Sequence, residues 1–119
     1  MQVTTPLGDA IDRYLNLESQ QMKLTASNMA NVDTPGYKTQ GIDLEGEFAK
    51  QLSSTIADEF MQPTVASIDG LVTRPDGNNV SLDREGMQLA KSQLQFRMGV
   101  ELLRHQFSGV MSAIHAETK

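Results

Sequence analysis

Apolar side chains recur at helical spacing along the first third of the chain. Residues 8–32 place Leu15, Met22 and Met29 seven positions apart, and a companion column contains Ile11, Glu18, Thr25 and Val32. This spacing predicts one amphipathic helix over 8–32. Its apolar surface is broader than a two-stranded seam needs, which leaves two interpretations: contact with several neighbouring chains, or packing within its own monomer.

The last third carries the most regular pattern. Its apolar positions alternate at spacings of four and three, interrupted by one polar residue: Leu89, Gln93, Phe96, Val100, Leu103, Phe107, Val110 and Ile114. This is the spacing of a coiled coil, and it predicts a helix over 83–115 with Asp83 as its N-cap. A coiled-coil pattern serves equally an intramolecular helical hairpin and contacts between chains.

The segment between these helices, 33–82, is less regular. Apolar residues recur every four positions from Phe48 to Phe60 and follow Asp43, a suitable N-cap, which predicts a short helix over about 44–58. Further on, the stretch Arg74-Pro75-Asp76-Gly77 suits a type I turn. We expect this turn to close a small hairpin that pairs 71–74 with 78–82.

A second turn ends the first helical pattern. Pro35 disfavours helical backbone at Thr34, and Pro35-Gly36 fits the two central positions of a type II turn. Tyr37 then supplies an amphipathic ring that can fix the turn to a neighbouring surface. An ordinary helix end followed by a turn would also account for Pro35 and Gly36.

Together these patterns predict a mainly α fold in a single unit spanning 1–119. The long N- and C-terminal amphipathic helices are expected to pair as an antiparallel coiled coil. A short middle helix and a small irregular or β-hairpin segment are expected between them.

Composition limits both the core and the partners of this chain. Only 39% of its 119 residues are hydrophobic and none is Trp, which favours a marginally stable monomer that gains stability from partner chains. A net charge of -5 and a pI near 4.8 argue against nucleic-acid binding. Residues 1–22 contain no continuous apolar run, so we expect neither a cleavable signal peptide nor direct membrane insertion.

Candidate chemistry is sparse. His105 and His115 are ten residues apart and cannot share one face as a metal pair, while Glu101 and His105 are better interpreted as an ion pair on a solvated helix face. The chain has no Cys, and no nucleophile stands beside a base or in a recognisable catalytic motif. We therefore expect no enzymatic activity, no metal and no cofactor.

Three sequence segments resemble a known family. Residues 27–38 read SNMANVDTPGYK, which is similar to the signature near the N-termini of bacterial flagellar axial proteins. Residues 76–85 read DGNNVSLDRE, and residues 41–44 read GIDL. In combination these segments resemble the flagellar basal-body rod proteins of the FlgB type, and the resemblance leaves roughly 46–70 unmatched.

The resemblance implies a structural subunit of the proximal rod, the drive shaft of the flagellar motor, that self-assembles through its terminal helices. It implies assembly roles for residues of the turn motif: Asn28, Asn31, Thr34, Pro35, Gly36 and Tyr37. The expected packing positions of the helices are Ile11, Leu15, Met22, Met29, Leu89, Phe96, Val100, Leu103, Phe107, Val110 and Ile114.

Partners and location follow from the same resemblance. The expected partners are other copies of the chain, other rod proteins, the membrane-ring adaptor at the rod base and the flagellar type III export apparatus. The expected location is the basal body, reached by export without a cleavable signal. A different class of protein stays open on the residues alone, namely a cytosolic coiled-coil adaptor or regulator that dimerises through 89–114.

Overall fold

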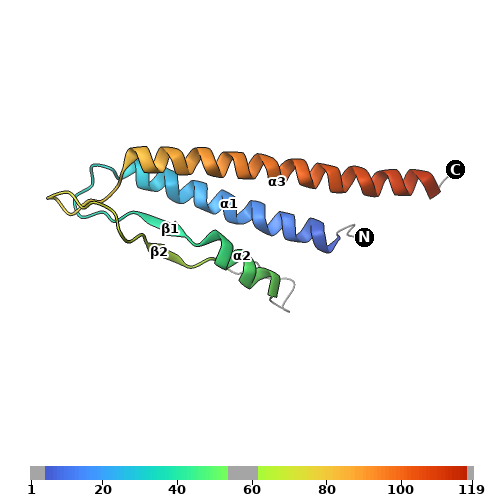
Figure 1. Cartoon of the computed structure of the whole chain (residues 1–119), viewed down its shortest axis with the longest axis horizontal. Coiled ribbons are helices and arrows are strands. Elements are labelled where there is room, and N and C mark those ends of the chain that lie inside the picture. The colour runs from blue at the N-terminus through green and yellow to red at the C-terminus, as the bar shows by residue number, and fades with distance from the viewer. Residues whose placement is uncertain (1–4, 54–61, 118–119) are drawn as a thin grey trace.

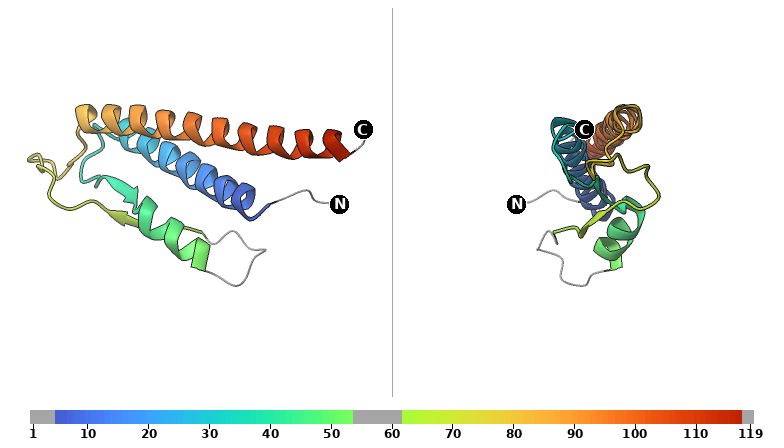
Figure 2. Two further views of the ribbon diagram at one scale, coloured as in Figure 1. Left: turned by 45° about the vertical axis from the view of Figure 1, so that its right-hand side comes forward. Right: turned by 90° about the vertical axis from the view of Figure 1, so that its left-hand side faces the viewer.

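The computed structural model describes residues 5–53 and 62–117 of the chain. Within them the elements are α1 (Pro6–Ala30), β1 (Gln40–Ile42), α2 (Leu44–Ser53), β2 (Val65–Ser67) and α3 (Leu82–Glu117). Helices α1 and α3 lie side by side and run in opposite directions, and α2 and the strand pair lie along the other flank of α1 (Figure 1). The left view of Figure 2 shows the same elongated arrangement, and the right view looks nearly along the long axis of the molecule. The mainly helical fold, with long terminal helices, a short middle helix and a small antiparallel strand pair, is confirmed.

The first helix begins two residues earlier than predicted because of its cap. The Oγ1 atom of Thr5 accepts a hydrogen bond of 3.0 Å from the backbone N–H of Gly8, and Pro6 occupies the first helical position. Proline is favoured there because that position leaves its N–H without a helical partner anyway. At the other end Asn31 caps the helix, and its Nδ2 donates to the carbonyl of Ser27.

The sequence predicted two N-caps, Asp43 and Asp83, of which the first is confirmed and the second is wrong. Asp43 caps α2 through a hydrogen bond of 3.3 Å from the backbone N–H of Gly46 to its Oδ1. The part of the predicted helix beyond Ser53 lies outside the described residues. The cap of α3 is Ser81 and not Asp83, since Ser81 Oγ accepts from the backbone N–H of Arg84 at 3.3 Å and the helix starts at Leu82.

The type II turn is confirmed. The backbone N–H of Tyr37 donates to the carbonyl of Thr34 at 3.2 Å, and Gly36 has φ of 75°. Glycine is required at this position because other residues rarely adopt positive φ.

The predicted hairpin is wrong in its pairing. Gly77 does close a turn on Arg74, at 2.9 Å with φ of 88°, but neither flank of that turn forms a strand. In the described part of the chain the strands that pair are β1 and β2, antiparallel, with Gln40 opposite Ser67 and Ile42 opposite Val65. Residues 78–80 instead hydrogen-bond mostly to the turn after α1.

The contact between α1 and α3 is unusually polar. The buried residues of α1 include Glu18, Thr25 and Asn28, and those of α3 are Glu85, Ser92 and Gly99, which are seven residues apart. Among the described residues only three hydrophobic side chains are buried: Ile11, Leu17 and Val80. The interior is therefore small, and much of it consists of polar groups that must be paired.

In the structure the predicted packing positions of α3 fall into two columns that differ in burial. One column is half-buried against α1, and it contains Leu89, Phe96, Leu103 and Val110. The other column contains Gln93, Phe107 and Ile114, which are exposed, and Val100, which is half-buried. The 4-3 alternation at the contact is completed by a different column: Glu85, Ser92, Gly99 and Gln106. On α1, Ile11 is buried, whereas Leu15, Met22 and Met29 are half-buried.

Small residues explain why the contact is shifted to this column. A Cβ atom at Gly99 would lie 2.6 Å from Cδ2 of Leu15 and 3.6 Å from Cδ1 of Tyr14. The two helices can approach closely at this point only because Gly99 lacks a side chain. The hydrophobic pattern alone does not reveal this close approach, because glycine and serine do not count as apolar positions in it.

Gly99→Leu should lower the free energy of unfolding by about 1 to 3 kcal/mol, because the added side chain has no space beside Leu15. Gly86 is the matched control on the same helix, since a Cβ there would meet nothing within 4 Å. Gly86→Ala should raise stability by about 0.5 to 1 kcal/mol through helix propensity. Urea unfolding of both variants measures the contrast, and equal tolerance at the two glycines would contradict the close approach.

Candidate functional site

The two sequence motifs, 27–38 and 76–85, meet at one end of the helix pair. The loop that follows α1 and the loop that precedes α3 lie against each other there, at the left of Figure 1. The backbone N–H of Gly36 donates to the carbonyl of Asp76 at 2.9 Å, and the N–H of Asn79 donates to the carbonyl of Tyr37. We call this contact between the loops and adjoining helix ends the motif junction.

Asn28 is the central side chain of the motif junction. It is fully buried, and its Nδ2 donates to the carbonyl of Gln40 at 2.8 Å and to Oε2 of Glu85 at 3.1 Å. Its Oδ1 accepts from the hydroxyl of Tyr37 at 3.0 Å and from the backbone N–H of Gln40 at 3.1 Å. All four hydrogen-bonding positions of the amide are therefore used. One side chain thus links α1, the turn, β1 and α3.

Asn78 joins the second motif to the turn after α1. Its Nδ2 donates to the carbonyls of Asn31 and Thr34, at 2.9 and 2.8 Å, and its Oδ1 accepts from the backbone N–H of Val80 at 2.8 Å. These carbonyls lie at and just beyond the end of α1, where backbone acceptors lack helical partners. Each of these carbonyls also accepts a backbone N–H within the turn, so Asn78 adds a second donor to both from a segment 44 or more residues away.

Neighbouring contacts complete the motif junction. The Oδ1 of Asn79 accepts from the backbone N–H of Thr39 at 2.7 Å, and both residues are buried. The guanidinium of Arg74 donates to the carbonyl of Val32, and the ammonium of Lys38 donates to the carbonyl of Gly77. A Cβ at Gly77 would lie 3.3 Å from the Cα of Gly36, so the two glycine turns touch.

The structure brings most of the residues of the turn motif into this network. Asn28 and Tyr37 contribute side chains and Thr34 a carbonyl, whereas Pro35 and Gly36 are exposed and shape the backbone. The sequence analysis did not select five buried or bonded residues: Thr39, Gln40, Asn78, Asn79 and Glu85. Adjacent amides after a turn were the available signal, because Asn side chains readily bond to nearby backbone groups.

The chemistry of the motif junction is hydrogen bonding between fixed groups. No group of three or more His, Asp or Glu side chains among the described residues is arranged to hold a metal ion. His105 is exposed, and Glu101 pairs with Arg104 at 3.1 Å, so the predicted partner of Glu101 was wrong. No helix within the described part of the chain is long and apolar enough to span a membrane.

A second buried polar group lies midway along the helix contact. Glu18 is fully buried, and no described donor meets either carboxylate oxygen in good hydrogen-bond geometry. Burial raises the pKa of this carboxyl above its ordinary value of 4.5, while the hydroxyls of Tyr14 and Ser92 and the charge of Lys91 oppose that rise. Burial, together with the nearby Glu18, raises the pKa of Tyr14 to about 12.

Comparisons with known proteins point to one family. A family model described as flagella basal body rod protein matches residues 15–38. The flagellar basal body rod protein FlgB of Salmonella typhimurium is 34% identical, over 84% of this chain and 86% of its own length. The FlgB proteins of Escherichia coli and Cereibacter sphaeroides are each 32% identical, over 86% and 87% of this chain and 88% and 89% of their own lengths.

Asn28→Ala should lower the free energy of unfolding by about 2 to 3 kcal/mol, because it removes the partners of the Gln40 backbone and leaves Oε2 of the buried Glu85 without this donor. Asn31→Ala is the matched control in the same motif, since the Asn31 amide donates to Ser27 one turn earlier and is not fully buried. It should cost less than about 1 kcal/mol. Urea unfolding compares the two, and a similar loss in both would show that Asn28 has no central role.

Glu18→Gln should stabilise the chain at pH 7 and make stability less dependent on pH. The folded-state pKa of Glu18 is raised, so its contribution is fully present below about pH 4.5 and is lost as the pH rises through the folded-state value. The stability difference between variant and parent should therefore shrink as the pH falls toward 4.5. Thermal unfolding between pH 4 and 8 measures this, and a constant difference would contradict the raised pKa.

Proposed function

Because the chain belongs to the FlgB family of flagellar basal body rod proteins, and is a structural subunit of the flagellum rather than an enzyme, we propose that it self-assembles through its terminal helices. In this proposal it forms the proximal rod of the motor drive shaft. The cytosolic adaptor has no observation in its favour, since the relatives above are all named as rod proteins.

The observation that carries the proposal is the distribution of apolar side chains. Twelve large hydrophobic residues are exposed in the described part of the chain, against three that are buried, and eight of the twelve lie on α3. Phe107 is 65% exposed and Ile114 is 46% exposed. Four of the eight, Met87, Leu94, Met98 and Leu102, share one face of the helix, and an exposed apolar face supports burial between subunits.

The motif junction supports a role in holding the two helices in one arrangement. Asn28, Asn31, Thr34, Pro35, Gly36 and Tyr37 are proposed as assembly residues because they set where the turn leaves α1 and where α3 starts. Asn28 contacts Glu85 directly, while at the far end Gln106 donates to Thr5 at 2.7 Å. These two contacts support the further proposal that α1 and α3 pair as an antiparallel coiled coil, within one rod-protein unit that spans 1–119.

The predicted packing positions would then act at two kinds of contact. Ile11, Leu15, Leu89 and Phe96 are buried or half-buried where α1 meets α3. Leu103 and Val110 are also half-buried against α1. The others would remain available to neighbouring subunits, namely Met22, Met29, Val100, Phe107 and Ile114. The heptad pattern of α3 would thus serve both the pairing with α1 inside one chain and the contacts between chains.

The partners and the location of the chain are known coarsely from its family and are proposed here in more detail. Membership of the family implies assembly with other flagellar basal body components and a place in the basal body. The finer proposal names other copies, other rod proteins, the membrane-ring adaptor and the type III export apparatus. The small buried core supports passage through an export channel, because a chain with little apolar burial unfolds at low cost.

Ile114→Asp should abolish motility in a deletion strain while the purified chain keeps its stability. The side chain is nearly half exposed, so the charge costs little in the monomer, whereas it would prevent apolar burial between subunits. Ala49→Asp, on the exposed face of α2, is the matched control outside the terminal helices and should leave motility intact. Swimming assays with immunoblots and unfolding curves provide the measurement. Normal motility of Ile114→Asp would contradict assembly through the terminal helices.

A further inference from the structure

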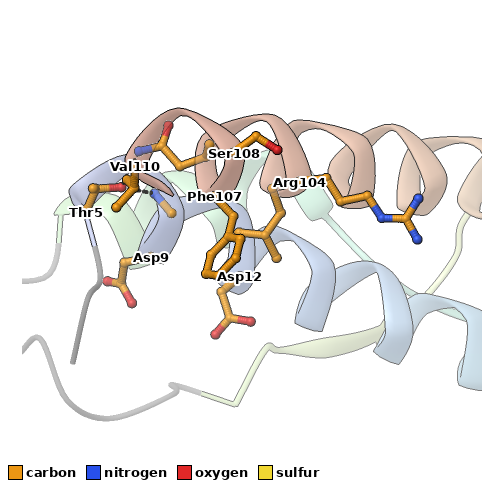
Figure 3. Close-up of a pocket in the computed structure, with 10 residues that line it drawn as sticks. Thr5, Asp9, Asp12, Arg104, Phe107, Ser108 and Val110 are labelled. Atoms are coloured by element: carbon orange, nitrogen blue, oxygen red, sulfur yellow. Dashed lines mark hydrogen bonds between the residues drawn. The ribbon is translucent and has the colours of Figure 1, made fainter. Parts of the chain in front are cut away.

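An apolar groove lies between the start of α1 and the C-terminal half of α3. It encloses about 570 Å³, and its apolar lining comes chiefly from Leu103, Phe107 and Val110 of α3. Figure 3 shows Phe107 pointing down from α3 toward Asp12 of α1. We call this feature the terminal groove. It is concave and apolar, which is the form of a surface that receives a side chain from a partner.

The α1 side of the terminal groove is acidic. Asp9 and Asp12 are exposed and line it (Figure 3). Asp9 pairs with Arg13 at 3.3 Å, whereas Asp12 has no ion pair within the part of the chain that the structure describes. A surface that fits the groove should therefore combine apolar side chains with a cation near Asp12.

Such a surface is present on α3 itself. Met87, Leu94, Met98 and Leu102 are 75%, 61%, 57% and 58% exposed, and at 100° per residue they lie on one face of the helix. Lys91, also exposed, lies on the same face between Met87 and Leu94. We call this face the outer stripe. By the same helical geometry it lies roughly opposite the face that carries Leu103 and Phe107.

We propose that the terminal groove of one copy receives the outer stripe of a second copy. The argument is complementarity: a concave apolar surface with a free carboxylate faces a convex apolar surface that carries a cation, and both belong to one chain. The proposal deepens the proposed function and rests on it, because it names the surfaces through which copies would meet.

The form of assembly follows from the position of the two surfaces. Because the groove and the stripe lie on roughly opposite faces of α3, one partner copy cannot fill the groove and cover the stripe at once, so the contact is heterologous. Each copy that fills one groove presents its own groove to the next copy. Repetition of such a contact builds a ring or an open helical array instead of a closed two-fold dimer, and a shaft requires the open form.

Engineered cysteines test the pairing directly, since the chain has no native Cys. Val110→Cys places a thiol at the terminal groove and Met98→Cys places one on the outer stripe. Under mild oxidation an equimolar mixture of the two purified full-length variants should give several-fold more disulfide dimer than either variant alone. Ser53→Cys, exposed on α2, mixed with Met98→Cys is the matched control and should give only the background level.

Charge exchange tests the polar part of the contact. Asp12→Lys in the Val110→Cys variant should lower the cross-linking yield several-fold, and Lys91→Glu in the Met98→Cys variant should do the same. Mixing the two doubly substituted variants should restore the yield, because the opposite charges are exchanged. If the mixture does not restore the cross-linking yield, the proposed pairing of Asp12 with Lys91 is wrong.

The outcomes separate this inference from the proposed function. Efficient dimer formation by Met98→Cys alone would indicate a two-fold contact between stripes and would overturn the groove proposal. Absence of cross-linking in every mixture would overturn it as well. In both cases loss of motility in Ile114→Asp would leave the rod function standing, whereas normal motility of that variant would count against the rod function itself.

Discussion

The buried amide of Asn28 connects segments that are far apart in the chain. It bonds to Gln40, Tyr37 and Glu85 at the same time. These hydrogen bonds can form together only when the end of α1, the turn and the start of α3 adopt one particular arrangement. Leaving a buried polar group without a partner costs more than its hydrogen bond gains when it forms. The network therefore fixes the relative positions of α1 and α3 more than it adds to the free energy of unfolding.

The contact between α1 and α3 uses the same principle along its length. Ser92 and Gly99 allow the helices to approach, and burial raises the pKa of the Glu18 carboxyl. A more apolar contact would make a more stable monomer. By using small and polar residues here, the chain leaves its large hydrophobic side chains on other faces, where neighbouring copies can bury them.

The sequence predicted the helices well because their periodicity is local. It also predicted the Pro35-Gly36 turn, whose conformation depends on the two residues themselves. It misplaced the strand pairing, since β1 and β2 are joined through contacts between distant segments that no local pattern records. The buried roles of Asn78 and Glu85 were missed for a similar reason: a hydrophobicity pattern treats an amide or a carboxylate as a surface residue until its partner is known.

Methionine oxidation tests most directly the central claim that α3 exposes faces which neighbouring subunits cover. Met87 is 75% exposed and Met98 is 57% exposed in the single chain. Brief peroxide treatment followed by mass spectrometry should oxidise Met87 and Met98 quickly in the purified chain and much more slowly in isolated basal bodies. Equal oxidation of these two residues in both states would contradict the account.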